Sequence, residues 1–552
     1  MTDSRHESME TKEPPLGRSA SASINIVLTG YMGTGKSSVA REVARLLGRP
    51  FVDMDERIEE RAGMTIPDIF RRQGEAAFRE LERAICRELA AQQGLVIATG
   101  GGALVDAENR RAMMRNGLVI CLDCDVEELL HRLRGDEGRP MLWSEDSAVG
   151  SEQKLRALWA ARRPAYAEVP HHIDTSYRSL KQVVAEVLAL VSAQPTTWEV
   201  QTPTGSYPVQ LVPGGLAHLG ALLKVRGVGG NLVAVSDEHV WALYSETIEA
   251  GLQASALNVT PVVLPAGERH KNLDTVRALY DRFVEAGLDR GAAVLAVGGG
   301  VITDMAGFAA ATYMRGVPLV QVPTTLLGMI DASVGGKVAV DHPAGKNLIG
   351  AFVRPLLVML DPTMLHTLPE PEYRAGLAEV IKAGIIGDAD LFAALEGLEG
   401  NKPSADLLRW MVERALQVKI DVVEEDPYER GRRMVLNLGH TFAHAFEVLS
   451  EYELSHGLAV SIGMAAAARL AQIRGLCSAE TAGRIIATLE RHALPTHYGE
   501  ASPQEVYEAM RRDKKSRGGT LRFILPRKIG DVIIDAEVRP EEVLQALEWI
   551  RP

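Results

Sequence analysis

Short apolar runs alternate with amphipathic stretches along most of the 552-residue chain. In the first third these runs are INIVLT, PFVDMD, LVIAT and GLVICLD, and a helical pattern starts near Lys36. The same order returns later with NLVAVSD, AAVLAVGGG, PLVQVPTT and LLVMLD. Buried strands that alternate with helices are typical of parallel α/β sheets. After Pro369 the pattern is rich in Ala, Leu and Glu and predicts helices, up to a strand pair near 521–525 and 531–534.

These changes in pattern divide the chain into five segments. Residues 1–20 have no hydrophobic period, so we expect a disordered tail there. A first α/β domain is expected over 21–192, and a linker over 193–202 where SAQPTT interrupts the helical pattern. The segment TWEVQTPTGSYPVQLVPGG carries a turn signal and predicts a hairpin. A second α/β domain is expected over 203–365 and a mainly helical domain over 366–552.

Composition narrows the picture by exclusion. With 46% hydrophobic and 24% charged residues, the chain is that of a globular protein. A net charge of −12, negative in both halves, argues against a nucleic-acid partner. Four cysteines fit a reducing compartment. Because no apolar run approaches the ~18 residues of a membrane span and the polar N-terminus lacks a signal-peptide core, we expect a cytoplasmic protein without a membrane partner.

The strand INIVLT runs into GYMGTGKS, which fits the P-loop pattern G-x4-G-K-[ST] between a strand and a helix. Glycines such as Gly33 and Gly35 let backbone N–H groups curl around phosphates. Lys36 would meet the β- and γ-phosphates, and Ser37 would hold Mg²⁺. A chance glycine-rich turn is the alternative. The correct flanks argue against it, as does the scarcity of lysine, at 14 against 46 arginines.

Three further features narrow the substrate of this first domain. Asp53 and Asp55 alternate at the end of PFVDMD, beside the P-loop in a doubly wound sheet. The run LVIAT ends in a triple glycine, 100–102. Arginines follow in FRELE, GRPML and ARRPAY, and planar guanidinium groups suit carboxylates and phosphates. A solvated surface position explains most single arginines, but the whole set in this order favours a binding site.

Together these motifs resemble the shikimate kinase family over about residues 24–180. The family pattern is a P-loop, D-x-D, F-R-x-x-E, a triple glycine, R-P and an arginine before P-x-Y. The resemblance implies a P-loop kinase domain with a parallel sheet, which phosphorylates shikimate to shikimate 3-phosphate with ATP. The residues implied for shikimate are Asp55, Arg79, Gly101 and Arg162; for ATP they are Gly33, Gly35, Lys36, Ser37, Ser38 and Arg139; for Mg²⁺ they are Ser37 and Asp53.

The resemblance also suggests individual roles. Asp55 would contact the 3-hydroxyl and act as a base, with Lys36 and Arg139 completing the catalytic set. Arg132 and Arg139 match arginines of the family's lid region. Arg163 is an alternative match to Arg162, and Arg162 is preferred for its distance from P-x-Y.

Cys121 and Cys124 form a C-x-x-C motif in the same domain. They lie in an apolar strand, and there is no second cysteine pair. We therefore expect structural core cysteines rather than a redox or zinc site.

In the second half, His440 and His444 place two imidazoles one helical turn apart. The glutamate of H-E-x-x-H is absent, which argues against a zinc protease. Alone, the pair could equally be metal-binding or structural. His456 follows, and Glu379 lies upstream. Two histidines and one carboxylate would give three protein ligands and an open position, the usual arrangement of a catalytic zinc site.

The segment AVGGGVITD follows a strand and opens a helix. Its spacing is not that of the dinucleotide fingerprint G-x-G-x-x-G, so by itself it indicates only that backbone approaches a phosphate or nucleotide. The motif-like stretches around it hold most lysines of this half, which favours a highly anionic substrate. These lysines are Lys337, Lys346, Lys382, Lys419, Lys514 and Lys515.

These segments closely resemble the 3-dehydroquinate synthase family over about residues 200–550. The matching stretches include PAGERHKN, VPTTLLGMIDASVGGK, GKNLIGAF, AEVIK, LNLGHTFAHA and RDKK. The resemblance implies a Rossmann-like NAD-binding α/β domain followed by a mainly α-helical metal-binding domain. The implied reaction converts 3-deoxy-D-arabino-heptulosonate 7-phosphate to 3-dehydroquinate and phosphate, with NAD⁺ and Zn²⁺ or Co²⁺.

The family's functional residues map onto this sequence as three groups, within a homodimer. The implied zinc ligands are Glu379, His440 and His456. The implied NAD⁺ contacts are Asp237, Glu268, Lys271, Gly299, Gly300, Asp304, Thr324, Thr325, Lys337 and Lys346. The implied substrate contacts are Asp331, Lys337, Lys346, Asn347, Lys382, Lys419, Arg433, Asn437, His444, either Lys514 or Lys515, and Arg315 from the neighbouring subunit; Lys337, Lys382 and His444 are the implied catalytic residues.

One position departs from the family pattern. The family reads HGEAV after the last zinc ligand, whereas Leu458 replaces the glutamate here. A carboxylate behind a metal-bound histidine can orient its ring. Zinc affinity is therefore the property that we expect this change to affect.

Two alternatives compete with a bifunctional shikimate-pathway enzyme of aromatic amino-acid biosynthesis. The second half could be a zinc- and NAD-dependent polyol dehydrogenase, but a neutral polyol needs no lysine cluster. One half could be inactive and regulatory, but the intact P-loop and the zinc triad argue against this. We therefore interpret the chain as a kinase followed by a synthase.

Overall fold

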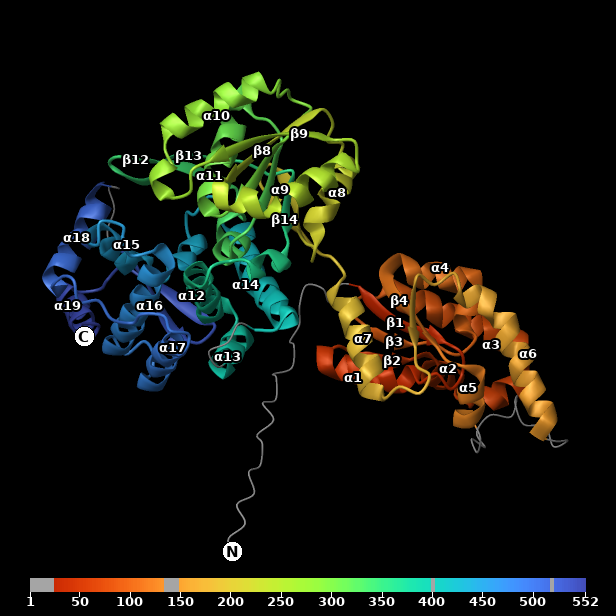
Figure 1. Cartoon of the computed structure of the whole chain (residues 1–552). Helices are drawn as coiled ribbons and strands as arrows, with labels where there is room; N and C mark the ends of the chain where they lie inside the picture. The colour runs from red at the N-terminus through yellow and green to blue at the C-terminus, as the bar shows by residue number, and fades with distance from the viewer. Residues whose placement is uncertain (1–23, 134–147, 399–402, 517–520) are drawn as a thin grey trace, which may run out of the picture. The chain divides into compact units, whose positions relative to one another are not determined.

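The chain folds into two compact units, Met1–Gln194 and Pro195–Pro552. Figure 1 shows both units, with many of their helices and strands labelled. The computed structural model describes residues 24–133, 148–398, 403–516 and 521–552.

Some predicted features lie outside the described residues. These are the expected disordered tail 1–20, the expected lid arginine Arg139 and the side chains of Lys514 and Lys515.

The first unit is built on a parallel sheet with the strand order β2-β3-β1-β4-β5. Its strands are β1 Asn25–Gly30, β2 Phe51–Asp53, β3 Val96–Ala98, β4 Gly117–Asp123 and β5 His171–Asp174. Its helices are α1 Lys36–Leu47, α2 Met54–Ala62, α3 Ile66–Ala91, α4 Ala107–Asn116, α5 Val126–Leu133, α6 Ala148–Tyr166 and α7 Leu180–Ser192. Every residue of the central strand β1 is buried, because helices cover both faces of the sheet.

The second unit begins with a seven-stranded sheet of order β6-β7-β14-β11-β10-β8-β9, parallel except for the β6–β7 pair. The strands are β6 Thr196–Thr202, β7 Gly205–Leu211, β8 Asn231–Asp237, β9 Asn258–Leu264, β10 Val294–Gly298, β11 Leu319–Pro323 and β14 Leu357–Leu360. The helices are α8 Leu219–Val225, α9 Glu238–Gln253, α10 Leu273–Glu285 and α11 Gly300–Thr312. A separate antiparallel hairpin, β12 Lys337–His342 and β13 Gly345–Phe352, packs against α11.

The expectation of a linker over 193–202 is wrong for its last seven residues, because they form β6. In this strand buried and exposed residues alternate, and Trp198 and Val200 are among the buried ones. The Trp198 indole also donates a hydrogen bond to Gln417, 2.9 Å away. The expected hairpin is confirmed, since β6 and β7 pair on either side of the predicted turn.

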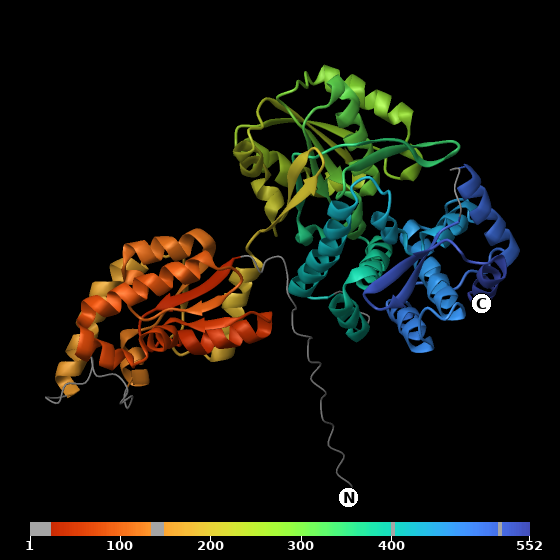
Figure 2. The same cartoon turned by 180° about the vertical axis from the view of Figure 1, so that it is seen from behind.

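The rest of the second unit is mainly helical. Its helices are α12 Glu370–Gly387, α13 Ala389–Gly397, α14 Ala405–Glu425, α15 His440–Leu449, α16 His456–Ile473, α17 Ala479–Arg491, α18 Pro503–Ser516 and α19 Pro540–Trp549. The late strand pair is confirmed as β15 Phe523–Lys528 and β16 Asp531–Asp535. Helices α12 and α16 lie side by side in Figures 1 and 2. Within the described ranges, no helix has the length and apolarity that a membrane crossing requires.

These elements confirm the expected fold class, a parallel-sheet kinase domain followed by an α/β domain and a helical domain.

The contact between α15 and α16 predicts a pair of opposite stability effects. A methyl group added at Gly463 would lie 2.1 Å from the carbonyl oxygen of Gly439, so Gly463→Ala should cost about 1–3 kcal/mol. In the same domain, Gly483 on α17 has no neighbouring atom within 4 Å of such a methyl group, and Gly483→Ala should stabilise by about 0.5–1 kcal/mol. Calorimetric unfolding of the full chain measures both, and equal shifts would contradict the close contact.

Candidate active sites

The P-loop of the first unit connects β1 to α1. Gly33 and Gly35 have φ of +83° and +91°, a backbone region that favours glycine. The Lys36 ammonium donates a hydrogen bond to the Tyr31 carbonyl oxygen at 2.8 Å. The Ser37 hydroxyl donates to the Asp53 carboxylate at 2.6 Å. This places a hydroxyl and a carboxylate, both suitable Mg²⁺ ligands, beside the loop.

Two other predicted contacts surround the same loop. Ser38 is exposed on the first turn of α1. Arg132 on α5 donates to the Thr175 carbonyl at 2.7 Å and approaches the Gly33 carbonyl at 3.5 Å. Arg132 therefore reaches the P-loop, as expected for a residue close to the nucleotide.

A second cluster forms where α2, α3 and the triple glycine meet. A methyl group at Gly100 would lie 2.5 Å from the Asp55 carboxylate and 3.6 Å from that of Glu82. Arg79 donates to the buried Glu82 carboxylate at 2.7 Å and to the exposed Glu75 at 3.3 Å. Burial raises the pKa of Glu82; the nearby Arg79 opposes this effect. At position 100, only glycine leaves room for the carboxylates of Asp55 and Glu82.

Arg162 belongs to this cluster, whereas Arg163 does not. The Arg162 guanidinium donates to the Gly101 carbonyl at 2.5 Å. A methyl group at Gly102 would lie 3.2 Å from an Arg79 nitrogen and 3.4 Å from an Arg162 nitrogen. Arg163 instead stacks on Trp159, 5.3 Å from the ring centre. Two guanidinium groups thus flank one backbone position, an arrangement suited to a carboxylate ligand.

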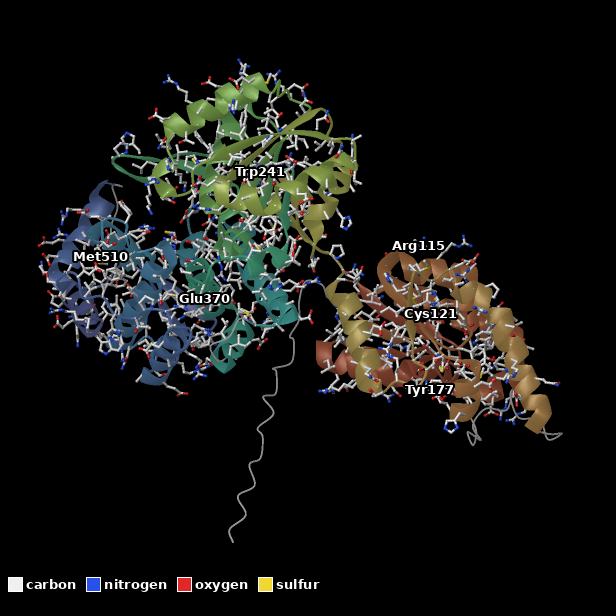
Figure 3. All side chains as sticks on the ribbon, in the orientation of Figure 1. Arg115, Cys121, Tyr177, Trp241, Glu370 and Met510 are labelled. Carbon is white, nitrogen blue, oxygen red and sulfur yellow. The ribbon has the colours of Figure 1, made fainter. Side chains whose placement is uncertain are left out.

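Cys121 and Cys124 are both buried, and Figure 3 shows Cys121 within the first unit. Burial raises the pKa of the Cys121 thiol. Cys121 lies near Asp123 and His172. However, the His172 ring nitrogens already meet the Asp123 carboxylate at 2.6 Å and the Val169 carbonyl at 3.0 Å. These contacts are those of structural side chains.

In the second unit, three side chains from three helices converge. Glu379 lies within α12, while His440 and His456 are the first residues of α15 and α16. Their ligand atoms all lie within 4.8 Å of one another. The Nε2 atoms of His440 and His456 lie 4.0 and 3.9 Å from the Glu379 Oε1 atom. That oxygen is buried and has no hydrogen-bond partner among the described residues, so the three side chains fit a metal ion.

The surroundings of His440 favour a neutral ring with a free Nε2 atom, which is the form that binds a metal ion. The His440 Nδ1 atom lies 3.2 Å from the Leu438 carbonyl, so its Nε2 is the free ligand atom. Burial and the charge of Lys382 lower the pKa of His440, which favours the neutral, metal-binding form. The His444 ring makes an edge contact with His440, 5.8 Å between centres.

A set of cations surrounds this cluster. Lys382 pairs with Glu379, Lys419 pairs with Asp331, and the four residues line a small cavity. The pairing with Lys419 holds the pKa of Asp331 well below its ordinary value despite burial. Such an arrangement places two lysine side chains beside the candidate metal cluster and suits an anionic ligand.

Further cations lie at the hairpin and at the loop before α15. Lys337 pairs with Glu429, which also accepts a hydrogen bond from Asn437 at 2.8 Å. Arg433 is buried and donates to the Pro427 carbonyl at 2.6 Å. Lys346 on β13 lies 3.4 Å from Glu447.

The carboxyl ends of β8, β10 and β11 form a third cluster. Asp237 ends β8, Gly299 and Gly300 follow β10, and Thr324 and Thr325 follow β11. The Thr324 N–H donates to the Gly298 carbonyl at 3.0 Å, which holds the two loops together. Ligands bind open α/β sheets at such strand ends.

Lys271 connects helix α11 to the β12–β13 hairpin. Its buried ammonium donates to Asp304 and to Asn347, both at 2.7 Å, and lies 3.9 Å from Glu268. Burial raises the pKa of Asp304 to about 6, although Lys271 opposes the shift. Three of the predicted NAD⁺ contacts, Glu268, Lys271 and Asp304, therefore lie together. Arg315, the substrate contact that the family resemblance assigns to a neighbouring subunit, lies exposed on the turn after α11.

Sequence reasoning missed two carboxylates, Glu429 and Glu447, and left Glu82 unassigned. Glu82 stands within the motif F-R-x-x-E, so its spacing from Arg79 could have identified it. Glu447 lies seven residues after His440, on the same helix face, which is also a sequence signal. No such pattern marks Glu429.

The fold and these clusters define a P-loop kinase joined to an α/β enzyme with a candidate metal centre, and comparisons with known proteins agree. The sequence model of shikimate kinase matches residues 32–192. Those of the 3-dehydroquinate synthase N-terminal and C-terminal regions match residues 261–375 and 376–516. The chain belongs to the 3-dehydroquinate synthase family and carries a shikimate kinase domain in front. It has two activities of the shikimate pathway, those of shikimate kinase and of 3-dehydroquinate synthase.

Individual relatives are similar to one or the other part of the chain. The 3-dehydroquinate synthase of a Synechocystis strain is 45% identical over 357 residues, 64% of this chain and 99% of that protein. Among solved structures, 2-epi-5-epi-valiolone synthase ValA from Streptomyces hygroscopicus, with NAD⁺ and Zn²⁺ bound, is 34% identical and covers 64% of this chain and 99% of that chain, with a TM-score of 0.58. Shikimate kinase from Acinetobacter baumannii, in complex with shikimate, is 42% identical over 30% of this chain and 92% of that chain, with a TM-score of 0.29.

The cluster around Arg79 predicts that its two carboxylate partners differ in importance. Because Glu82 is buried and holds Arg79 from the protein side, Glu82→Gln should raise KM for shikimate about tenfold, equivalent to about 1.4 kcal/mol. Glu75→Gln, which changes the exposed partner of the same arginine, should change KM less than twofold. Steady-state kinetics with varied shikimate measure both, and equal effects would show that Glu82 does not position Arg79.

Proposed function

We propose that the first unit binds ATP through Gly33, Gly35, Lys36, Ser37 and Ser38, with Mg²⁺ held by Ser37 and Asp53. The contact of 2.6 Å between the Ser37 hydroxyl and the Asp53 carboxylate supports this assignment. The neutral Ser37 hydroxyl and the Asp53 carboxylate would both be available to hold the ion. Positioning and electrostatic stabilisation dominate catalysis of phosphoryl transfer.

Shikimate binds on the other side of the loop in this proposal. Arg79 and Arg162 flank Gly102 and hold the carboxylate of the substrate. Asp55 accepts the proton of the attacking hydroxyl, and the absence of a side chain at Gly100 keeps the space beside its carboxylate open. Arg139 lies outside the described residues, and its role in holding ATP phosphates stays a prediction from the family resemblance.

In the second unit we propose that Glu379, His440 and His456 hold Zn²⁺ or Co²⁺, and that the strand-end cluster binds NAD⁺. The single observation that carries this is the buried Glu379 Oε1 atom, which faces two imidazole nitrogens and has no partner among the described residues. Two related structures support the choice of groups. ValA is described with NAD⁺ and Zn²⁺, and 2-deoxy-scyllo-inosose synthase, 26% identical with a TM-score of 0.59, with NAD⁺ and Co²⁺.

The residues around the triad then perform the reaction on the heptulosonate phosphate. A bound metal ion would supply Lewis acidity toward a coordinated hydroxyl, and NAD⁺ would supply reversible hydride acceptance, so that the substrate would undergo no net oxidation. His444 shuttles a proton in this reaction. The residues that bind the carboxylate, hydroxyls and phosphate of the substrate are Asp331, Lys337, Lys346, Asn347, Lys382, Lys419, Arg433, Asn437 and one of Lys514 and Lys515.

We also propose that the protein works as a homodimer in the cytoplasm. Arg315 lies exposed on a turn where both it and Met314 have positive φ, of +66° and +50°. Conformations of this kind are strained in non-glycine residues and cluster at functional positions. This supports the role that the family resemblance gives to Arg315, which is to reach the site of a neighbouring subunit. The four free cysteines support a reducing compartment.

Crossed inactivation tests the assignment of one activity to each unit. Lys36→Ala should lower shikimate phosphorylation about 100-fold or more, because it removes a cation that stabilises the transferred phosphate. Phosphate release from the heptulosonate phosphate should persist in this variant. Conversely, treating the wild-type chain with a chelator, followed by its removal and addition of Mg²⁺, should abolish only the synthase activity. Added Zn²⁺ or Co²⁺ should restore it, and a chelator-resistant synthase would refute the metal assignment.

Complementation between subunits tests the dimer. Arg315→Ala should inactivate the synthase by removing a group from the partner's site, and His444→Ala should inactivate the subunit's own site. Co-expression of the two variants should restore about a quarter of the wild-type activity, since half of the dimers are mixed and each has one complete site. Restoration of no activity, with mixed dimers demonstrated, would place Arg315 in its own subunit's site.

A further inference from the structure

The Nδ1 atoms of the two candidate metal-binding histidines face different hydrogen-bond acceptors. The Nδ1 atom of His440 faces a neutral acceptor, the Leu438 carbonyl, at 3.2 Å. The Nδ1 atom of His456 lies 3.3 Å from the Oε1 atom of Glu447, a carboxylate. The Glu447 side chain is only 4% exposed, so its contacts are with the protein rather than with solvent.

The geometry of His456 is that of a ligand with a fixed tautomer. Its Nε2 atom faces the Glu379 oxygen at 3.9 Å, while Nδ1 faces Glu447 on the opposite side of the ring. A carboxylate at Nδ1 keeps the proton on that nitrogen and leaves the Nε2 lone pair free for a metal.

Glu447 has a counter-charge from another part of the second unit. The Lys346 ammonium, on strand β13, lies 3.4 Å from the same Oε1 atom and sits over the Tyr452 ring at 4.7 Å. A buried carboxylate needs such a partner to remain charged. Glu447 therefore joins the β12–β13 hairpin to the metal-binding helix α16.

The contact between Glu447 and His456 bears on position 458, where the family has a glutamate and this chain has Leu458. Leu458 is half-buried, and its side chain has no oxygen that could accept a hydrogen bond from an imidazole. We propose that Glu447 is the residue that positions His456 for the metal ion, so that the chain does not depend on a carboxylate at position 458. This proposal rests on the metal site proposed above. It adds a residue that the family resemblance did not supply.

The test measures metal affinity rather than turnover. Metal-free full-length protein is titrated with Zn²⁺ in competition with a chromophoric chelator, and with Co²⁺ while its visible absorption is recorded. Glu447→Gln keeps the size of the side chain and removes its charge, and it should weaken Zn²⁺ binding about 10- to 100-fold and alter the Co²⁺ spectrum.

Glu453→Gln is the matched control. Glu453 is exposed in the loop between α15 and α16. Within the described residues, no hydrogen bond or ion pair joins its side chain to His456 or Lys346. The Glu453→Gln substitution removes the same charge from the same region. The Zn²⁺ affinity and Co²⁺ spectrum of this variant should equal those of the wild type. The thermal midpoints of the three metal-free proteins should agree, which separates positioning from folding.

The outcomes distinguish this proposal from the metal site itself. Tight Zn²⁺ binding by wild type with unchanged affinity and spectrum in Glu447→Gln would overturn the role of Glu447 and leave the metal site intact. Equal weakening in both variants would reduce the effect to general electrostatics and also overturn it. A wild-type chain that binds no metal would overturn both proposals.

Discussion

A buried carboxylate oxygen that lacks a hydrogen-bond donor is the constraint on which the second unit depends. Glu379 pairs with Lys382 through one oxygen, while the other has no partner among the described residues. Leaving such a group unsatisfied is unfavourable, by about 1–3 kcal/mol or more for a charged group. A cation held between Glu379 and the two histidines, as proposed, would remove this cost. Stability of the helical domain would then be linked to metal binding.

The packing of the helices follows from this requirement. Both histidines begin their helices, so the start of α15 and the start of α16 must approach α12 closely. Glycine allows the approach, because a methyl group at Gly457 would lie 2.1 Å from the Ala375 carbonyl, and one at Gly463 would meet Gly439. Residues with no chemistry of their own thus determine where the imidazoles lie.

Sequence reasoning predicted what is local and missed what is long-range. The P-loop, the strand–helix alternation and the candidate triad are predictable because glycine spacing, hydrophobic period and ligand type are visible in short segments. The start of β6 was missed because TTWEVQT follows a proline and resembles a linker until its pairing with β7 is known. Glu429 was missed because its partners Lys337 and Asn437 approach it only through the fold.

Net charge shows the same limit in another form. A chain at −12 is expected to repel anions, yet both units present cations at their clusters. The carboxylates beside Arg79, Lys419 and Lys382 explain this, because each holds a cation in place and lowers the cost of burying it. A substrate anion entering such a site meets prepositioned charges rather than the average field of the surface.

The substitution at Leu458 illustrates why a broken motif does not imply a lost function. A motif records which sequence position usually carries a group, whereas the chemistry requires only that an acceptor reach the Nδ1 atom of His456. Helix α15 begins at one candidate metal ligand and returns to the same face seven residues later, where Glu447 stands. The carboxylate therefore reaches His456 from the neighbouring helix. In the proposed role, Glu447 would supply this acceptor from another position in the sequence.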